Sequence, residues 1–475
     1  ILDGRLTTFT KIINHVSTEI IERYPSTYLG KIMLIAKHGE VTKAYHLFDE
    51  FRAKTRNFIT HNDQALTDSF KIEADVVSFF LDGLSDTPQT TQHMKKMESV
   101  LKEVRDNDHF LAAVLQNFLC FGYFLNDQYS KAFSAGEAAI SHFREIGSIY
   151  GENFLYFHLG KICLAQGRLR DAEQFYDEGY SLAVKNYDGS SDIIAIAAAH
   201  LSEIAYEKNQ LDEVQKFLDI CLPQVEHSEA WLDVYLSAYF SAANICHRRG
   251  SFRKAMTVLN RASKTGRTRN YRRLRLLSAT QCVRFLIDRG KLKKAHWIIH
   301  KLQFHNIINS DITGLLIGNR VVNEFILVIA YFYIHNNQSL KATKLIEPLL
   351  TKTRRNNNRR NLISLLILSS SAYFKQDKHM QAMSRFNEAV SNSVFEGFKQ
   401  PFLEHASETR EIIEFALANT QLFPINRLKR TFLTDLTSII NRQKNSGLVQ
   451  EKGTLTPREK EMVKHVCDGC SNKEI

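Results

Sequence analysis

The residues best suited to ligand chemistry form an arginine cluster between Gly266 and Leu276: Arg267, Arg269, Arg272, Arg273 and Arg275. A guanidinium group donates two parallel hydrogen bonds to a phosphate or a carboxylate. The cluster is therefore a candidate site for an anionic effector, or an auxiliary contact to DNA. The alternative is a solvated outer face that binds nothing. A second basic cluster, within residues 352–360, is interpreted as an exposed loop between helices.

The arginine cluster belongs to a longer basic block. Between Val234 and Ser310 there are seventeen Lys and Arg residues and a single acid, Asp288. The whole chain has 62 Lys and Arg residues against 51 Asp and Glu, so 45 basic and 50 acidic residues remain elsewhere. The net charge of +11 is thus a local feature. It does not by itself indicate a nucleic-acid-binding protein.

Motifs for catalysis or metal binding do not occur in the sequence. Cys467 and Cys470 have a spacing known from zinc sites, but without a second pair they are interpreted as ordinary thiols. The 18 histidines include no His-Glu-x-x-His, and neither a Gly-x-Ser-x-Gly elbow nor a phosphate-binding glycine loop is present. We therefore expect no enzyme activity and no cofactor. ATP would be expected only if a nucleotide-binding domain precedes Ile1.

The elements that must position these residues are helices in a repeat of about forty residues. A small residue after a turn recurs at eight positions: Ala44, Ala132, Ala172, Val214, Ala255, Ala295, Ala342 and Ala382. The first interval is 88 residues, which predicts two periods with one degenerate unit near residues 86–100. Only seven prolines occur in 475 residues, so few helix breakers interrupt the chain. The expected fold class is all-α.

Five positions before each small residue lies a Gly, Asn or Asp: Gly39, Asp127, Gly167, Asn209, Gly250, Gly290, Asn337 and Asp377. These residue types tolerate a left-handed backbone. Each is predicted to end one helix of a hairpin, and the small residue lets the next helix approach closely. A single hairpin cannot bury its apolar face, so the hairpins must stack into a curved solenoid over residues 1–440. The alternative is an irregular helical bundle.

Parts of the repeat resemble the tetratricopeptide pattern. The matching residues are Leu159, Gly160, Cys163, Gly167, Ala172, Tyr176 and Gly179, and then Tyr373, Asp377, Ala382, Phe386 and Ala389. The period exceeds the usual 34 residues of this family, so the helices or loops are expected to be longer. Such an array has no chemistry of its own. It binds a peptide, a protein or a small ligand on its concave groove.

Beyond a polar linker at residues 441–454, the sequence predicts two short helices. The pattern begins at Leu455. Thr456 and Glu459 form a capping box around Pro457. Met462, Val463 and Val466 give the first helix an apolar face. A glycine stop and a second capping box at residues 471–474 follow. Two helices joined by a glycine turn are typical of the start of a helix-turn-helix domain.

Residues 455–475 closely resemble the start of the LuxR-type DNA-binding domain. The matching residues are Leu455, Thr456, Arg458, Glu459, Glu461, Gly469, Ser471, Asn472, Glu474 and Ile475, with Cys470 as a departure. The chain ends before the recognition helix, so we interpret the domain as incomplete. The resemblance implies phosphate contacts from Ser471, Asn472 and Lys473, without base reading.

A helical-repeat array followed by a LuxR-type domain resembles the MalT-like large regulators. This resemblance implies a bacterial transcriptional activator in which the repeats bind an effector and the terminal domain binds DNA and acts on RNA polymerase. Homo-oligomers are a further partner compatible with the resemblance, and the sequence does not fix the oligomeric state. We expect a cytoplasmic protein, because seven scattered cysteines form no disulfide framework and no apolar run spans a membrane. The first residue is Ile1, so the chain is interpreted as part of a longer protein. The alternative function is a protein-binding scaffold that does not read DNA.

Overall fold

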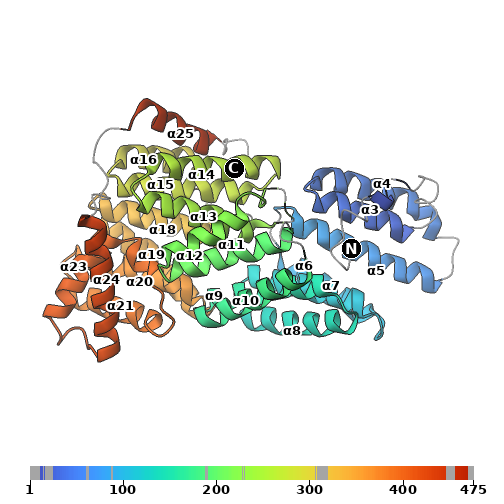
Figure 1. The fold of residues 1–475 in the computed structure, drawn as a ribbon, viewed down its shortest axis with the longest axis horizontal. Helices are drawn as coiled ribbons and strands as arrows, with labels where there is room; N and C mark the ends of the chain where they lie inside the picture. The colour runs from blue at the N-terminus through green and yellow to red at the C-terminus, as the bar shows by residue number, and fades with distance from the viewer. Residues whose placement is uncertain are drawn as a thin grey trace.

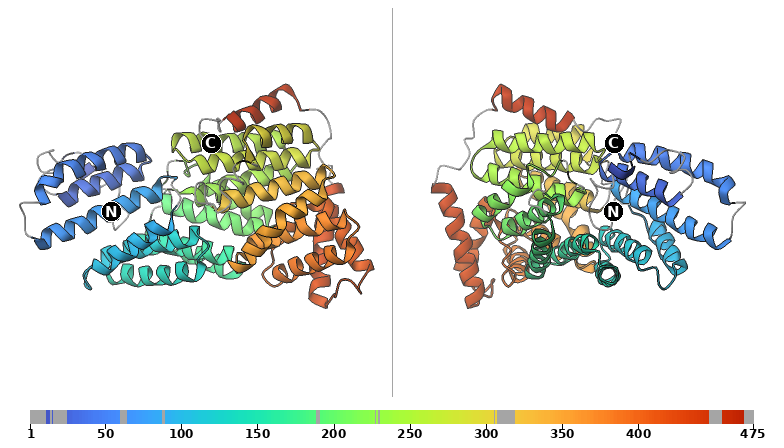
Figure 2. Two further views of the ribbon diagram at one scale, coloured as in Figure 1. Left: turned by 180° about the vertical axis from the view of Figure 1, so that it is seen from behind. Right: turned by 45° about the vertical axis from the view of Figure 1, so that its right-hand side comes forward.

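The computed structural model describes residues 11–445, except 14, 16–24, 60–63, 87–88, 188–190, 227, 229, 305 and 307–318, and it describes residues 455–468. Every regular element in these residues is a helix (Figures 1 and 2). The all-α fold predicted from the periodicity and the scarcity of proline is therefore confirmed. None of the described helices is both long and apolar enough to cross a membrane.

Within the described residues the helices pair into nine consecutive hairpins, each with a first, inner helix and a second, outer helix. The hairpins are α3 (Pro25–Lys37) with α4 (Val41–Ile59), α5 (Gln64–Leu84) with α6 (Thr91–Glu103), α7 (His109–Leu125) with α8 (Tyr129–Glu145), α9 (Ile149–Ala165) with α10 (Leu169–Asn186), α11 (Asp192–Glu207) with α12 (Leu211–Cys221), α13 (Leu232–Arg248) with α14 (Phe252–Thr268), α15 (Arg272–Asp288) with α16 (Leu292–Lys301), α18 (Asn319–His335) with α19 (Ser339–Arg355), and α20 (Arg359–Phe374) with α21 (His379–Ser393).

The turns inside these hairpins lie where the sequence predicts them. All eight predicted turn residues have a left-handed backbone, with φ between +56° and +87°. At Gly167 the amide donates to the Leu164 carbonyl at 3.0 Å and the next amide, of Arg168, donates to the Cys163 carbonyl at 2.9 Å. These bonds satisfy carbonyl groups that the end of α9 would otherwise leave unpaired. The eight aligned small residues are all fully buried, with no exposed surface.

The long first interval of the repeat contains the additional hairpin that the spacing predicts. Helices α5 and α6 occupy it, and Met94 and Met97 of α6 are buried where the other outer helices bury alanine. Gly122 of α7 approaches the Met94 side chain closely, since an added Cβ would lie 3.3 Å from its Cγ. In this hairpin the larger methionine side chains therefore fill the helix interface. In the other hairpins a small residue at the same position lets the two helices approach closely.

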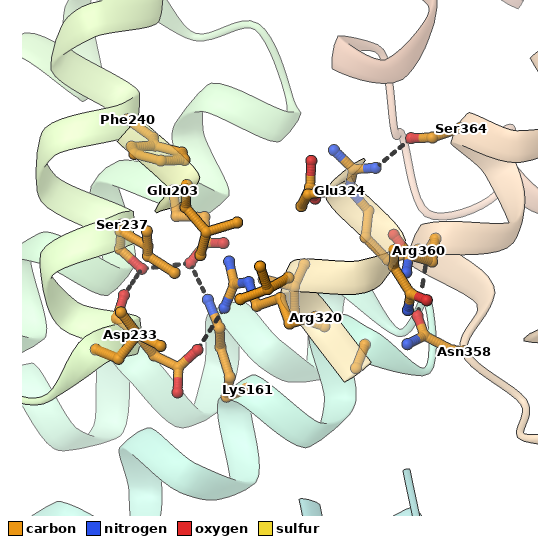
Figure 3. A pocket seen from close by; sticks show the side chains of 18 of the residues that line it. Lys161, Glu203, Asp233, Ser237, Phe240, Arg320, Glu324, Asn358, Arg360 and Ser364 are labelled. Carbon is orange, nitrogen blue, oxygen red and sulfur yellow. Dashed lines mark hydrogen bonds and ion pairs between the residues drawn. The ribbon is translucent and has the colours of Figure 1, made fainter. Parts of the chain in front are cut away.

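The stack of hairpins curves until it meets itself. Inner helices α9, α11, α13, α15, α18 and α20 contact one another in order, and α20 returns to contact α9. The closure includes a bond from the Lys399 amide to the Glu207 carbonyl at 3.0 Å, and one from the Asn358 side chain to the Tyr129 hydroxyl at 2.7 Å. The concave groove expected of a curved solenoid is thus a central cavity inside a closed turn of helices (Figure 3).

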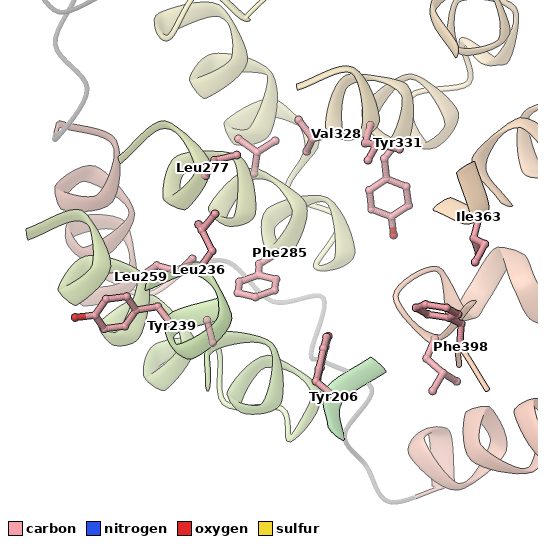
Figure 4. Packing of buried hydrophobic residues seen from close by; sticks show 14 of the residues in the cluster. Tyr206, Leu236, Tyr239, Leu259, Leu277, Phe285, Val328, Tyr331, Ile363 and Phe398 are labelled. Carbon is pink, nitrogen blue, oxygen red and sulfur yellow. The ribbon is translucent and has the colours of Figure 1, made fainter. Parts of the chain in front are cut away.

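One continuous apolar core runs from α9 to the last described helix. It includes Tyr206, Phe285 and Tyr331, which pack between successive hairpins (Figure 4). Helices α3, α4 and α5 share a smaller core around Phe48. Each hairpin therefore buries its apolar surface against its neighbours, as stacking of repeats requires.

Four helices follow the last hairpin: α22 (Gln400–Leu403), α23 (Ala406–Ala418), α24 (Arg427–Asn445) and α25 (Pro457–Asp468). Helix α24 extends five residues into the segment predicted as a linker, and the rest of that segment lies outside the described residues. In Figure 1, α25 lies across the top of the molecule, where it contacts α14 and α15, far in sequence from the helices that it covers.

Candidate functional site: a charged central cavity

The inner helices enclose a cavity of about 240 Å³ (Figure 3). Every inner helix from α7 to α20 contributes to its wall, and so does the segment that holds α22. The charged residues of the wall are Asp127, Lys161, Glu203, Glu207, Asp233, Arg273, Arg284, Arg320, Glu324, Arg360 and Glu404. Charged side chains are rarely buried unless they are paired. Their concentration at one place therefore indicates a binding site.

One side of the cavity is a network around Glu203. Its carboxylate accepts hydrogen bonds from Lys161 and from the Ser237 hydroxyl, both at 2.5 Å. Nearby, Arg320 pairs with Asp233. Burial alone would raise the pKa of Glu203, but the positive charges of Lys161 and Arg320 outweigh it and lower this pKa to about 2. Glu203 is therefore ionised at any physiological pH.

A second charged group lies across the cavity. Arg284 donates to Glu404 at 2.8 Å, and Arg360 donates to Glu207 at 2.7 Å. Burial raises the pKa of Glu207 to about 7; Arg360 opposes this shift, and the negative charge of Glu404 adds to it. Glu324 of α18 also faces this part of the cavity, between the two groups (Figure 3). This side therefore holds more acid than base.

A second cavity of about 160 Å³ adjoins the first and has a different character. Aromatic and aliphatic side chains form most of its wall, and Phe121 is common to both cavities. Its single Lys or Arg residue, Lys37, lies 4.5 Å from the ring centre of Tyr150 and donates to its hydroxyl at 2.7 Å. A ligand group in this cavity would be apolar.

The arginine cluster predicted from the sequence does not form one surface. Arg267 is exposed, Arg272 is half-buried and Arg275 is buried. Arg269 donates to two backbone carbonyl groups, at 2.9 and 3.1 Å, and lies against Gly39. Arg273 pairs with Asp86 at 2.5 Å, and both side chains are buried. Of the five, only Arg273 lines the central cavity. Binding of an anion by this cluster remains a prediction.

The arginines of the basic block find their counter-charges elsewhere in the chain. Besides Arg273, Arg261 pairs with Glu226, Arg284 with Glu404 and Arg289 with Glu459. All four acids lie outside residues 234–310, in the part of the chain with a slight acidic excess. Much of the basic block is therefore matched internally, by contacts that no local pattern could reveal.

Helix α15 connects the cavity to the C-terminal helix. Arg273, Leu277, Gln281 and Arg284 line the cavity along one face of α15. The residue that follows the helix, Arg289, pairs with Glu459 of α25 at 3.0 Å. Arg289 also lies over the Phe252 ring, 4.7 Å from its centre. One rigid helix thus touches both the cavity wall and α25.

Helix α25 begins with the capping box that the sequence predicts. The Thr456 amide donates to the Glu459 carboxylate at 2.9 Å, and the Glu459 amide donates to the Thr456 hydroxyl at 3.3 Å. Burial alone would raise the pKa of Glu459, but the bonds from Thr456 and Arg289 outweigh it and lower this pKa. The predicted apolar face is also confirmed: Val463 and Val466 are fully buried in the core that α14 and α15 share.

Two further predictions fall at or beyond the end of this helix. Ser471, Asn472 and Lys473, the predicted phosphate contacts, lie outside the described residues, as does Cys470. Cys467 is buried. In the described part of the chain no group of three or more His, Cys, Asp or Glu side chains is arranged to hold a metal ion.

The sequence analysis named Arg273, and it placed Arg360 in an exposed loop, whereas Arg360 is paired with Glu207 in the cavity wall. The other charged residues of the cavity were missed. A signal was present: Lys161, Glu203, Arg284 and Glu324 are single charges within otherwise apolar stretches of inner helices. A charge in such a stretch must find a partner or a cavity. The sequence could not tell which of these charges meet, because the curvature of the stack decides it.

The model of the MalT-like TPR region matches residues 85–418. The chain belongs to this family. The matched residues begin between α5 and α6 and end with α23. No curated protein matches the sequence significantly.

Solved structures with the same fold include the crystal structure of a Rap protein complexed with competence and sporulation factor. It covers 78% of this chain and 98% of its own, with 12% identity and a TM-score of 0.56. This likeness shows the fold alone. The apo form of RapI covers 89% of this chain and 99% of its own at 11% identity, but its TM-score is only 0.30.

Proposed function

We propose that this chain is the effector-sensing region of a DNA-binding transcriptional activator. An effector binds in the central cavity and controls a LuxR-type helix-turn-helix domain that begins at Leu455. The role is non-enzymatic. Family membership supports the sensing region, and the ten matching residues in 455–475 support the DNA-binding domain. RNA polymerase and homo-oligomers are the further partners that this proposal implies.

The observation that carries the proposal is the position of α15. Its inner face lines the cavity, and the residue at its end holds α25, the first helix of the proposed DNA-binding domain. A ligand that shifts α15 would therefore alter the contact with α25. Packed helices transmit such shifts because their interfaces do not deform continuously.

The mechanism requires two states of the repeats. In one, α25 lies against α14 and α15, as in the present structure. In the other, α25 is released, and the DNA-binding domain is free to pair or to bind DNA. An effector changes this equilibrium only if it binds one state more tightly.

The test is DNA affinity of the intact protein, including the complete helix-turn-helix, with and without candidate metabolites and peptides. Fluorescence anisotropy of labelled DNA and calorimetry of the effector would be measured on the same sample. The proposal expects at least one effector to change DNA affinity about five- to hundredfold, a common range for allosteric coupling. If effectors bind and DNA affinity never changes, the cavity does not control DNA binding.

The second candidate is a scaffold that binds a protein or peptide partner without reading DNA. The structural neighbour complexed with competence and sporulation factor favours it, since a repeat array of this fold there holds a partner. A partner that binds the repeats equally well in the presence and absence of saturating DNA, in a protein with no measurable DNA affinity, would favour this candidate.

A further inference from the structure

One side of the central cavity has an unequal number of charges. Three carboxylates, of Glu207, Glu324 and Glu404, share this region with two guanidinium groups, of Arg284 and Arg360. Both arginines are already bonded, Arg284 to Glu404 and Arg360 to Glu207. Each also interacts electrostatically with Glu324. Within the described chain Glu324 makes no hydrogen bond or ion pair, so one carboxylate remains without a directly bonded cation.

The other charges of the cavity do not correct this inequality. Lys161 is bonded to Glu203 and Arg320 to Asp233, so these pairs are neutral. Arg273 also lines the cavity, but its guanidinium is held by Asp86.

Arg248 interacts with Glu404 and bonds to the neutral side chains of Asn209 and Gln400, so its charge offsets the excess of acid. Within the described chain Glu324 still accepts no hydrogen bond, and a half-buried carboxylate is stabilised by a donor. The cavity therefore favours a ligand that donates a charge-assisted hydrogen bond to Glu324.

The position of Glu324 on α18 directs it to the cavity. Arg320, Glu324 and Leu327 are spaced three and four residues apart, so they lie on one face of the helix, and all three line the cavity. Leu236, Phe240 and Leu277 contribute apolar surface to the same cavity. A ligand here meets a carboxylate at one point and aliphatic or aromatic surface around it.

We infer that the central cavity binds a protonated primary amine carried on an apolar body, with the ammonium group at Glu324. This inference rests on the proposed function only in taking the cavity as the effector site. A free alkylamine or the amino terminus of a short apolar peptide would supply the same chemistry. An ammonium group donates three hydrogen bonds, so it can bond to Glu324 and still reach a neighbouring oxygen.

The experiment is isothermal titration calorimetry of the 475-residue chain in an amine-free buffer. The probes are n-hexylamine and n-hexanol, which share an apolar body and differ in charge. We expect the amine to bind roughly tenfold more tightly or better, as a charge-assisted hydrogen bond implies. In Glu324→Gln, which removes the charge and keeps the shape, this preference should disappear. In Glu411→Gln, on the exposed surface of α23, it should remain.

The conservative variant Glu324→Asp controls for folding. It keeps the charge, so the preference for the amine should be reduced and not lost, while circular dichroism establishes that all variants are folded. A second pair of probes, Leu-Leu-amide and its N-acetyl form, distinguishes a peptide amino terminus from a free alkylamine. If only the peptide pair shows the preference, the effector is a peptide.

Three results would overturn the inference: neither amine probe binds, the amine binds no better than its neutral analogue, or Glu324→Gln retains the preference. These outcomes are separable from failure of the proposed function. Amines that bind at Glu324 without changing DNA affinity leave the inference intact and contradict the sensor. An anionic or neutral effector that changes DNA affinity supports the sensor and contradicts the inference.

Discussion

Two arginines near the C-terminal end of α15 make the same kind of contact to very different parts of the molecule. Within the helix, Arg284 pairs with Glu404, and the two side chains are 13% and 11% exposed. Directly after the helix, Arg289 pairs with Glu459, and these two side chains are 11% and 14% exposed. The chemistry and the burial are nearly equal. What differs is the element that carries the acid.

Glu404 follows α22, where Phe402 and Leu403 are buried in the closed turn of hairpins from α9 to α20, called the ring below. Glu459 belongs to α25, which packs on α14 and α15 near the end of the described chain. Loss of the first pair therefore disturbs the closed ring, whereas loss of the second weakens the packing of one helix. A contact of the same chemistry and burial can thus be part of the ring or can hold a helix that is able to separate from the ring. Only the second kind, a separable contact, can act as a switch.

The largest effect is expected for Arg284→Met, which leaves the Glu404 carboxylate buried without its main partner. Removing one partner of a buried ion pair costs about 3–5 kcal/mol. The free energy of unfolding, followed by circular dichroism in urea, should fall by this order. The double variant Arg284→Met, Glu404→Gln should recover most of the loss. A single variant as stable as the wild type would mean that the ring does not depend on this pair.

The next effect is a pH dependence at Glu207, on the same side of the ring. Its pKa is raised to about 7 from an ordinary value of 4.5, so the folded state binds the proton more tightly than the unfolded state. The stability that protonation contributes is complete below pH 4.5 and is lost as the pH rises through 7. The groups that face this carboxyl are Arg360, Glu404 and Glu203, named in order of their influence.

The measurement compares Glu207→Gln with the wild type at pH 5 and at pH 8. The variant does not titrate at this position, so its stability relative to the wild type should increase by roughly 1–3 kcal/mol between these values. Buried His158 and His405, whose pKa values burial lowers to about 4, titrate alike in both proteins and cancel. A constant difference would show that Glu207 titrates near its ordinary pKa.

The sequence was sufficient for the local structure of the repeats. A left-handed turn needs Gly, Asn or Asp, and a close helix contact needs a small residue, so both requirements are visible in any one hairpin. Gly167 and Ala172 illustrate this: each was predicted from its type and spacing, and each has the expected backbone or burial. The capping box at Thr456 is equally local and equally predictable.

The site was not predictable in this way. Arg360 and Glu207 are 153 residues apart, and Arg273 and Asp86 are 187 apart. Such pairs form only because small rotations between successive hairpins add up to a closed turn, and the repeat pattern does not specify these rotations. The basic block was therefore interpreted as a surface or an anion site, when several of its arginines hold the ring and α25 together.

The separable contact is tested more directly by Val463→Asp. A carboxylate in place of this fully buried side chain cannot remain in the apolar interface, so α25 should leave α14 and α15. The urea midpoint of the ring should change little, while amide hydrogen exchange in residues 457–468 should approach the rate of an unprotected helix. Lys464→Asp, at the exposed neighbouring position, should keep the protection. Protection retained in Val463→Asp would show that α25 is held by other contacts.

The smallest effect is expected for Arg289→Ala, which removes the bond to Glu459 and the contact with the Phe252 ring. A charge-assisted hydrogen bond contributes about 1 kcal/mol or slightly more, so exchange in α25 should become roughly five- to tenfold faster, with no change in the ring. Arg253→Ala, on the exposed side of α14, is the matched control and should not alter exchange.

Because Arg289 follows the helix that lines the cavity, Arg289→Ala also reports on the coupling between the cavity and α25. If Arg289→Ala weakens the packing of α25 but leaves its response to a cavity ligand unchanged, the shift of α15 must reach α25 through Val463 and Val466. If the response is lost, the ion pair itself transmits it.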